Sequence, residues 1–509
     1  MDARDSFVPG RQVDIANLKD VRELPEKRQQ ARAQEIRAGA SFLHEMPRFP
    51  RTRKCRDLAF ALLFLLTVLA LVAFVVYAMM GINTEINDDS DFKRLKSYDK
   101  QNVKDIMQVA LVVNFSIFIA CIGGLITAFL WVMLARVCAR PVVYASVYFI
   151  PFLWMVAGIG LVIFGLTQPH STQAAVAGAF LLILGLLQAT CFWCCYSRFI
   201  PFTIEVVEMV AEASNQNPGT IFIAAAGGLV SMLWWITALV AYAAFEMKHE
   251  KDYQDQNKNV MGPTDVAFFL VMVWGAGVIS NVCHMTYCGI FSRWYFNEDG
   301  AWCCQSLKVA LTTSFGSICF GTLIVAAIQA VQALLRSART ALQEDGNIVG
   351  CIVMLILECI VSVIGDLMEY FNEWVYVQCA IRGGNYCQSV RMTCAMVSCN
   401  GLQAIIAELL VNTVVTLGTV LSGVVGLLLA CVFCFSQAKS NQDWVPVAGA
   451  IGGFLGGLFV GGTFMRIFSS GSKTILMCWA EEPRLLHQEH DFNDLHNEMN
   501  AKIRDYELS

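Results

Sequence analysis

Long apolar runs separated by shorter polar segments dominate the hydropathy pattern of this chain. A helix needs about 20 predominantly apolar residues to cross a bilayer. Ten runs meet this requirement, at residues 58–81, 106–134, 142–166, 173–196, 220–245, 265–291, 306–335, 348–370, 410–435 and 445–468. The pattern therefore predicts an all-α polytopic membrane protein with about ten transmembrane helices and short interfacial helices between them.

The composition agrees with this pattern. Of the 509 residues, 56% are hydrophobic and 15% are charged, whereas soluble domains average about 25% charged residues. The 41 acidic residues barely outnumber the 36 basic ones, and no basic stripe is present that would bind nucleic acid. Because the first 54 residues are charged and the first apolar run is long, we expect residues 58–81 to act as an uncleaved signal anchor.

The predicted topology places both ends of the chain on one side of the membrane, because the number of spans is even. A basic cluster precedes the first span and indicates that this side is cytosolic; it contains Arg48, Arg51, Arg53, Lys54 and Arg56. We therefore predict a largely disordered cytosolic N-terminal tail at 1–55, a ten-span transmembrane domain at 56–470, and a cytosolic C-terminal tail at 471–509.

Polar and apolar segments between the spans predict further helices. Residues 201–215 place Glu205, Glu208 and Glu212 on one helical face and valines elsewhere, which predicts a short helix that docks against the bundle or faces the cytosol. The mostly apolar connection at 371–409 predicts interfacial or partly embedded helices. In the last span, glycines recur every four residues from Gly449 to Gly461, a pattern that serves either close helix packing or a mobile gate.

Sequence signals for enzymatic chemistry are missing. There is no HExxH or GxSxG motif, and the glycine-rich segment GGLFVGGT lacks the lysine of a phosphate-binding loop. On the predicted topology none of the 20 cysteines falls in an outer loop, and the CxxC pairs have no second pair that would complete a metal site. We therefore expect no catalytic residues, no metal and no cofactor.

The sixth span carries polar groups at membrane depth. Trp274, Asn281 and His284 share one helical face, because they are spaced by seven and three residues. Polar side chains in a bilayer are costly and usually face a bundle interior or a water-filled path. These residues either line or gate a path for a solute, or form an interhelical hydrogen bond worth roughly 0.6 to 2 kcal/mol.

Tryptophans within the spans offer a second candidate feature. Trp154, Trp234, Trp235 and Trp274 lie nearer the middle of their spans than the interface, where tryptophan usually gathers. Indole rings attract organic cations, so these side chains either line a path for such a cation or fill space in the bundle.

An acidic side chain in the eighth span also has two interpretations. Glu358 lies within the span, and Asp366 and Glu369 follow near its end. Glu358 either attracts a cation or exchanges a proton, or it pairs with an arginine. Gln329 in the seventh span has the same ambiguity between solute contact and helix packing.

Four sequence blocks resemble the choline transporter-like proteins, most closely their short-loop microbial branch. The sixth span is similar to that family's pattern in Val278, Ile279, Asn281, Val282, His284, Gly289, Trp294, Tyr295 and Phe296. The other similar blocks are LTTSFGSICFGTLIVAAIQ at 311–329, YFNEWVYVQCAIRGGNYCQSV at 370–390, and SGSKTILMCWAEEP at 470–483. This chain departs from the family in a short first outer loop at about 82–105 and in Trp374 and Val375 before Tyr376.

The resemblance implies ten spans, cytosolic termini, residence in the plasma membrane, and facilitated movement of choline or a related amine such as ethanolamine, with or without linkage to protons. From their residue types and their depth in the spans, the candidate substrate-binding residues are Trp274, Asn281, His284, Trp154, Trp234, Trp235 and Glu358. The alternative is a membrane scaffold or signalling protein that does not transport and acts through its charged ends. The sequence does not indicate an oligomeric state.

Overall fold

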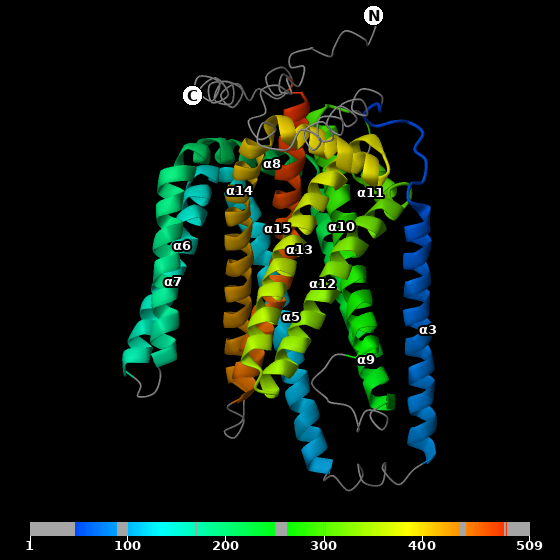
Figure 1. The fold of residues 1–509 in the computed structure, drawn as a ribbon, viewed down its shortest axis with the longest axis vertical. Coiled ribbons are helices and arrows are strands. Elements are labelled where there is room, and N and C mark those ends of the chain that lie inside the picture. The colour runs from blue at the N-terminus through cyan, green and yellow to red at the C-terminus, as the bar shows by residue number, and fades with distance from the viewer. Residues whose placement is uncertain are drawn as a thin grey trace, which may run out of the picture.

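The computed structural model describes residues 46–88, 100–167, 172–249, 262–298, 300, 302–437, 444–482 and 485. Within these residues every regular element is a helix (Figure 1). Ten of the helices are long and apolar enough to cross a membrane. The prediction of an all-α polytopic membrane protein is confirmed.

The long helices follow the predicted spans closely, and two short helices lie between them. The long ones are α3 (Leu58–Asp88), α5 (Lys100–Val137), α6 (Ala139–Thr167), α7 (Thr172–Cys191), α9 (Gly219–His249), α10 (Pro263–Tyr295), α12 (Phe315–Glu344), α13 (Ile348–Arg382), α14 (Tyr386–Gln437) and α15 (Trp444–Glu481). The short ones are α8 (Ile200–Gln216) and α11 (Trp302–Leu311).

The seventh predicted span, 306–335, begins at the wrong residue. The structure ends α11 at Leu311 and starts α12 at Phe315. The chain just before α3 crosses this point: a Cβ on Gly316 would clash with the carbonyl oxygens of Arg56 and Asp57, and the Ser317 hydroxyl donates to Asp57 over 2.6 Å. This crossing is a tertiary contact, so the hydropathy pattern does not reveal it.

The apolar connection at 371–409 is helical, as predicted, but it extends the two neighbouring spans. Helix α13 continues to Arg382, and α14 starts after only three further residues, at Tyr386. Gly383 ends α13 in the left-handed conformation, with φ of 66°, which glycine adopts without steric cost. The two long helices therefore meet at a tight turn.

Helix α8 confirms the predicted helix at 201–215. It lies across one end of the bundle and contacts α5, α6, α14 and α15 (Figure 1). Val206, Val207 and Val210 are fully buried, so the valine face docks against the bundle. Helices α6 and α7 form a hairpin at one side, and α3 stands at the opposite side.

Glycines bring α15 into backbone contact with α14 and α5. A Cβ on Gly453 would lie 2.7 Å from the carbonyl oxygen of Gly426 in α14, and one on Gly457 would clash with that of Ser422. On the other side, a Cβ on Gly124 in α5 would lie 3.0 Å from the Cα of Gly457. The close-packing interpretation of the glycine pattern is confirmed, and α5, α14 and α15 form one tightly packed unit.

Replacing Gly457 by alanine should separate α14 from α15 and destabilise the protein. The new methyl group meets backbone atoms that cannot rotate away, and overpacking of this kind costs about 1 to 3 kcal/mol. Thermal unfolding of the purified protein in detergent measures the effect. Gly462→Ala is the matched control, because its Cβ would make an ordinary contact of 3.7 Å with Thr419. Equal melting temperatures for the two variants would contradict the packing argument.

Candidate functional site

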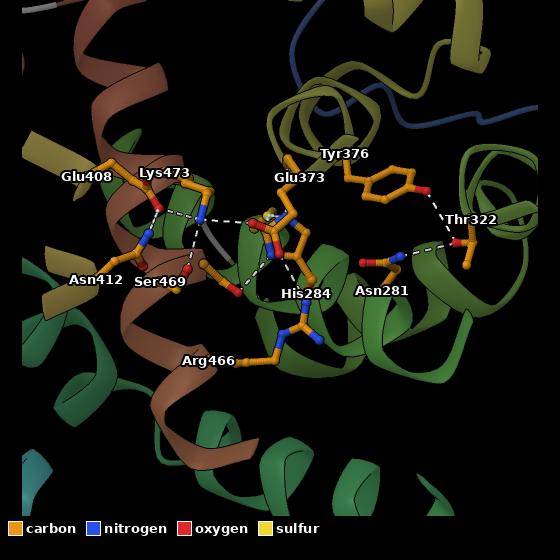
Figure 2. A network of polar contacts seen from close by, with 12 residues as sticks. Asn281, His284, Thr322, Glu373, Tyr376, Glu408, Asn412, Arg466, Ser469 and Lys473 are labelled. Carbon is orange, nitrogen blue, oxygen red and sulfur yellow. Dashed lines mark hydrogen bonds and ion pairs between the residues drawn. The ribbon is translucent and has the colours of Figure 1, made fainter. Parts of the chain in front are cut away.

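A buried lysine joins three helices near the end of α15 (Figure 2). Lys473 is 1% exposed, and its Nζ forms ion pairs with Glu373 in α13 over 2.9 Å and with Glu408 in α14 over 2.5 Å. The same Nζ donates to the hydroxyl of Ser469 over 2.8 Å. The ammonium group is therefore surrounded by oxygen acceptors inside the bundle.

Two further residues complete this charge cluster. Arg466 lies seven residues before Lys473, on the same face of α15, and its Nη2 pairs with Glu373 over 3.0 Å. The amide of Asn412 donates to Glu408 over 2.7 Å. The two carboxylates are thus balanced by two cations, which is the condition under which charges are tolerated away from water.

His284 connects α10 to the charge cluster through the backbone of α13. Its Nε2 lies 2.9 Å from the carbonyl oxygen of Glu373, and its Nδ1 lies 2.7 Å from the Ser470 hydroxyl. A carbonyl can only accept, so Nε2 carries a proton and, in the neutral ring, the Ser470 hydroxyl donates to Nδ1. A hydroxyl can also accept, so the same geometry accommodates a protonated ring.

A second group of polar contacts lies beside His284, between α10, α12 and α13 (Figure 2). The Asn281 amide donates to the Thr322 hydroxyl over 3.1 Å, and that hydroxyl lies 3.4 Å from the Tyr376 hydroxyl. The Asn372 amide donates to the carbonyl oxygen of Gly321 over 2.9 Å. These contacts are between uncharged groups, in contrast to the cluster around Lys473.

A cavity of about 550 Å³ opens between α10 and α12. Its lining residues are Phe269, Gln329, Gln332, Ala333, Arg336, Ser337 and Thr340. Thr322, Gln329 and Arg336 are spaced by seven residues, so they form a polar stripe along one face of α12. The stripe leads from the cavity, over about 10 Å per seven residues, to the contact with Asn281.

The end of the bundle opposite the cavity is bridged by residues 46–57, which we call the strap. Arg48 pairs with Glu481 over 2.6 Å and with Glu482 over 2.7 Å. Burial lowers the pKa of Arg48, but these two carboxylates outweigh it and raise the pKa above its usual value. Arg53 donates to the carbonyl oxygens of Ala380 and Ile381 over 2.8 and 3.1 Å. The strap therefore ties α13 to α15.

Arg53 has an environment different from that of Arg48. Burial lowers the pKa of Arg53 to about 10, and the positive charge of Arg293 adds to the effect. Its guanidinium is bound by backbone carbonyls at the end of α13, where the helix dipole favours a positive charge. A direct ion pair also links the same helices, because Arg382 lies 2.5 Å from Glu481.

The candidate residues in α10 lie inside the bundle. Asn281 and His284 take part in the contacts described above, and the Trp274 indole donates to the carbonyl oxygen of Cys319 in α12 over 3.1 Å. The Trp234 indole donates to the carbonyl oxygen of Met272 over 2.9 Å, which places it beside α10. The structure brings these four residues into one region.

The remaining candidates lie elsewhere. Trp154 in α6 and Trp235 in α9 are 37% and 36% exposed, on the outer surface of the bundle. Glu358 is bound by two arginines of α12, with Arg336 at 2.8 Å and Arg339 at 3.0 Å. The arginine-paired interpretation of Glu358 therefore matches its contacts, and the structure does not join these three residues to Asn281.

The charge cluster itself was missing from the candidate residues. Lys473 and Glu373 lie beyond the predicted ends of their spans at 468 and 370, whereas α15 and α13 continue to Glu481 and Arg382. The signal that could have identified them is the seven-residue spacing of Arg466 and Lys473, which puts both cations on one face of a helix without a charged residue between them.

Lys473→Met should destabilise the protein by about 3 to 5 kcal/mol, because it leaves a buried carboxylate without its partner. Adding Glu408→Gln should recover part of the loss by removing that charge. Thermal unfolding in detergent measures both effects. Lys308→Met is the control, since Lys308 is exposed in α11. Unfolding of Lys473→Met at the wild-type temperature would show that the cluster contributes little to stability.

Comparison with known proteins connects this architecture to a family. Residues 179–484 match the model of the family described as plasma-membrane choline transporter. The relatives include Protein PNS1 of Eremothecium gossypii, 29% identical over 79% of this chain and 73% of the relative. Protein PNS1 of Debaryomyces hansenii is 27% identical over 85% of this chain and 84% of the relative. The family match covers the charge cluster, the polar stripe and α10, and the chain belongs to the choline transporter-like family.

Proposed function

We propose that the protein moves a small organic cation of the choline or ethanolamine class across the plasma membrane. The observation that carries this proposal is the polar stripe of α12. It leads from an open cavity, past Gln329, to the half-buried contact between Thr322 and Asn281. A stripe that served packing alone would not need to begin at a cavity. The family match supports a transporter rather than an enzyme.

The proposed path runs between α10, α12 and α13. Asn281, Thr322 and Tyr376 would offer neutral polar contacts to a solute, and the aromatic rings of Tyr376 and Trp274 would attract a positive charge. Trp154 and Trp235 are left out of this path, because their rings face outward. Glu358 attracts a cation weakly in this arrangement, since two guanidinium groups already surround it.

Movement along this path requires the strap end of the bundle to open. Glu373 in α13 pairs with both Lys473 and Arg466 in α15, and the strap ties the same two helices together. A solute that passes Asn281 would reach these ion pairs next. Their rearrangement would let it leave, and the basic residues of the strap support a cytosolic position for that exit under the positive-inside rule.

Uptake into proteoliposomes tests the transport proposal. Wild-type protein should give saturable choline or ethanolamine flux, and Asn281→Ala or Trp274→Ala should lower it by about tenfold, which corresponds to about 1.4 kcal/mol. Trp235→Ala is the matched control and should keep its flux, because that ring lies on the outer surface. If folded wild-type protein carries none of these amines, the scaffold alternative is favoured.

The pH dependence of uptake tests whether His284 links transport to protons. An ordinary histidine changes charge between about pH 5 and 8, and both neighbours of the His284 ring can accommodate the change. His284→Gln keeps a donor and an acceptor but cannot titrate, so its flux should be flat over this range while wild-type flux varies. If the pH dependence of uptake by His284→Gln is the same as that of the wild type, His284 does not link transport to protons.

A further inference from the structure

The cavity between α10 and α12 carries a positive charge in its lining. Of its seven lining residues, Arg336 carries a formal charge, and no carboxylate is among them. The others supply amide and hydroxyl groups, apart from Phe269 and Ala333. The lining therefore combines one positive charge with uncharged polar groups and an aromatic ring, which suits a ligand that carries an anionic group as well as an ammonium.

The ion pair between Arg336 and Glu358 uses one nitrogen atom of the guanidinium. Its Nε pairs with one oxygen of Glu358, and the Nε of Arg339 pairs with the other. One carboxylate is thus shared between two guanidiniums, so this group of three carries a net positive charge. The Arg336 side chain is 62% exposed, and its ion pair with Glu358 is made through Nε, so the guanidinium can also face a ligand in the cavity.

The neighbours of Arg336 complete a set of hydrogen-bond donors. Gln329 and Gln332 lie seven and four residues before Arg336, so α12 presents their amides on the same side. The Thr340 hydroxyl instead donates to the carbonyl oxygen of Arg336 over 3.1 Å. Guanidinium groups bind phosphate through parallel N–H donors, and amides can donate to the remaining oxygens. Phe269, from α10, provides an aromatic ring that suits a quaternary ammonium.

The position of the cavity along the membrane normal also suits a phosphate group. Arg336 lies eight residues before the end of α12 at Glu344, or about 12 Å along the helix axis. An arginine near the end of a membrane-spanning helix lies close to the level of the lipid headgroups. A ligand could therefore enter this site from the water or from the adjacent leaflet.

We propose that this cavity binds the phosphate group of a phosphate-bearing amine, with Arg336 on the phosphate and Phe269 against the ammonium. The chemistry is that of phosphocholine, either as a soluble molecule or as the headgroup of a phospholipid. The proposal rests on the transport function above for the later passage of the ligand, whereas binding at the cavity does not depend on that function.

Equilibrium binding of radiolabelled phosphocholine to the full-length protein in maltoside detergent tests the soluble source. Wild-type protein should bind it saturably, inorganic phosphate should compete, and choline should compete poorly. Arg336→Gln should weaken binding at least about tenfold, whereas Glu358→Gln should strengthen it, because it releases both guanidiniums. Arg140→Gln is the control, since Arg140 is exposed on α6, and should bind as the wild type does.

Native mass spectrometry of the same samples tests the lipid source. If the headgroup is the ligand, wild-type and Glu358→Gln protein should retain phosphatidylcholine that Arg336→Gln loses. Dependence on Arg336 in either measurement supports the proposal and identifies the source. The proposal is overturned if neither probe depends on Arg336, or if Glu358→Gln weakens phosphocholine binding and choline competes fully.

The uptake assay separates this inference from the transport proposal. Arg336-dependent binding without flux of any amine would contradict transport and leave the phosphate site intact. Saturable choline flux that Arg336→Gln does not change, together with no phosphate binding, would support transport and contradict the phosphate site.

Discussion

The neutralisation of two buried carboxylates by Lys473 is the interaction on which the arrangement of the bundle depends. Glycine packing already joins α14 to α15, so the pair with Glu408 acts within one unit. The pair with Glu373 instead fastens α13 to that unit. Because neither carboxylate could remain charged in this environment without a cation, this ion pair holds α13 to α15 in addition to the buried apolar side chains of α13.

Glu373 then transmits the position of α13 to α10. Its carboxylate binds Lys473 and Arg466, while its carbonyl oxygen accepts from His284. The adjacent Asn372 binds the backbone of α12. A shift of α13 relative to α15 must therefore change the contacts of both α10 and α12. Ion pairs of this kind have discrete alternative partners, which is how small displacements become changes between two states.

The sequence predicted the spans because lipid requires every backbone polar group to be bonded within a helix, and long apolar runs follow from that requirement. It could not predict which sides of those helices face one another. Trp154 and Trp274 have similar surroundings in the sequence, yet one ring faces outward and the other is buried. The break before α12 depends on Asp57 and Ser317, which are 260 residues apart, and the carboxylates that pair with Lys473 lie 100 and 65 residues before it. Local patterns carry no signal for such contacts.

The two ends of the bundle carry different groups, and this difference bears on the order in which a ligand would meet them on the proposed path. At the strap end, an ion pair joins α13 to α15 directly. The strap joins them again, because Arg48 pairs with Glu481 and Arg53 binds the carbonyl oxygen of Ala380. At the other end, α10 and α12 leave a cavity in which a guanidinium is exposed. A ligand that enters this cavity meets positive charge first and neutral polar groups next. On the proposed path the ion pairs of Lys473 follow. A molecule with both an anionic and a cationic group can match the cavity itself, because the guanidinium of Arg336 favours the first group and the ring of Phe269 favours the second.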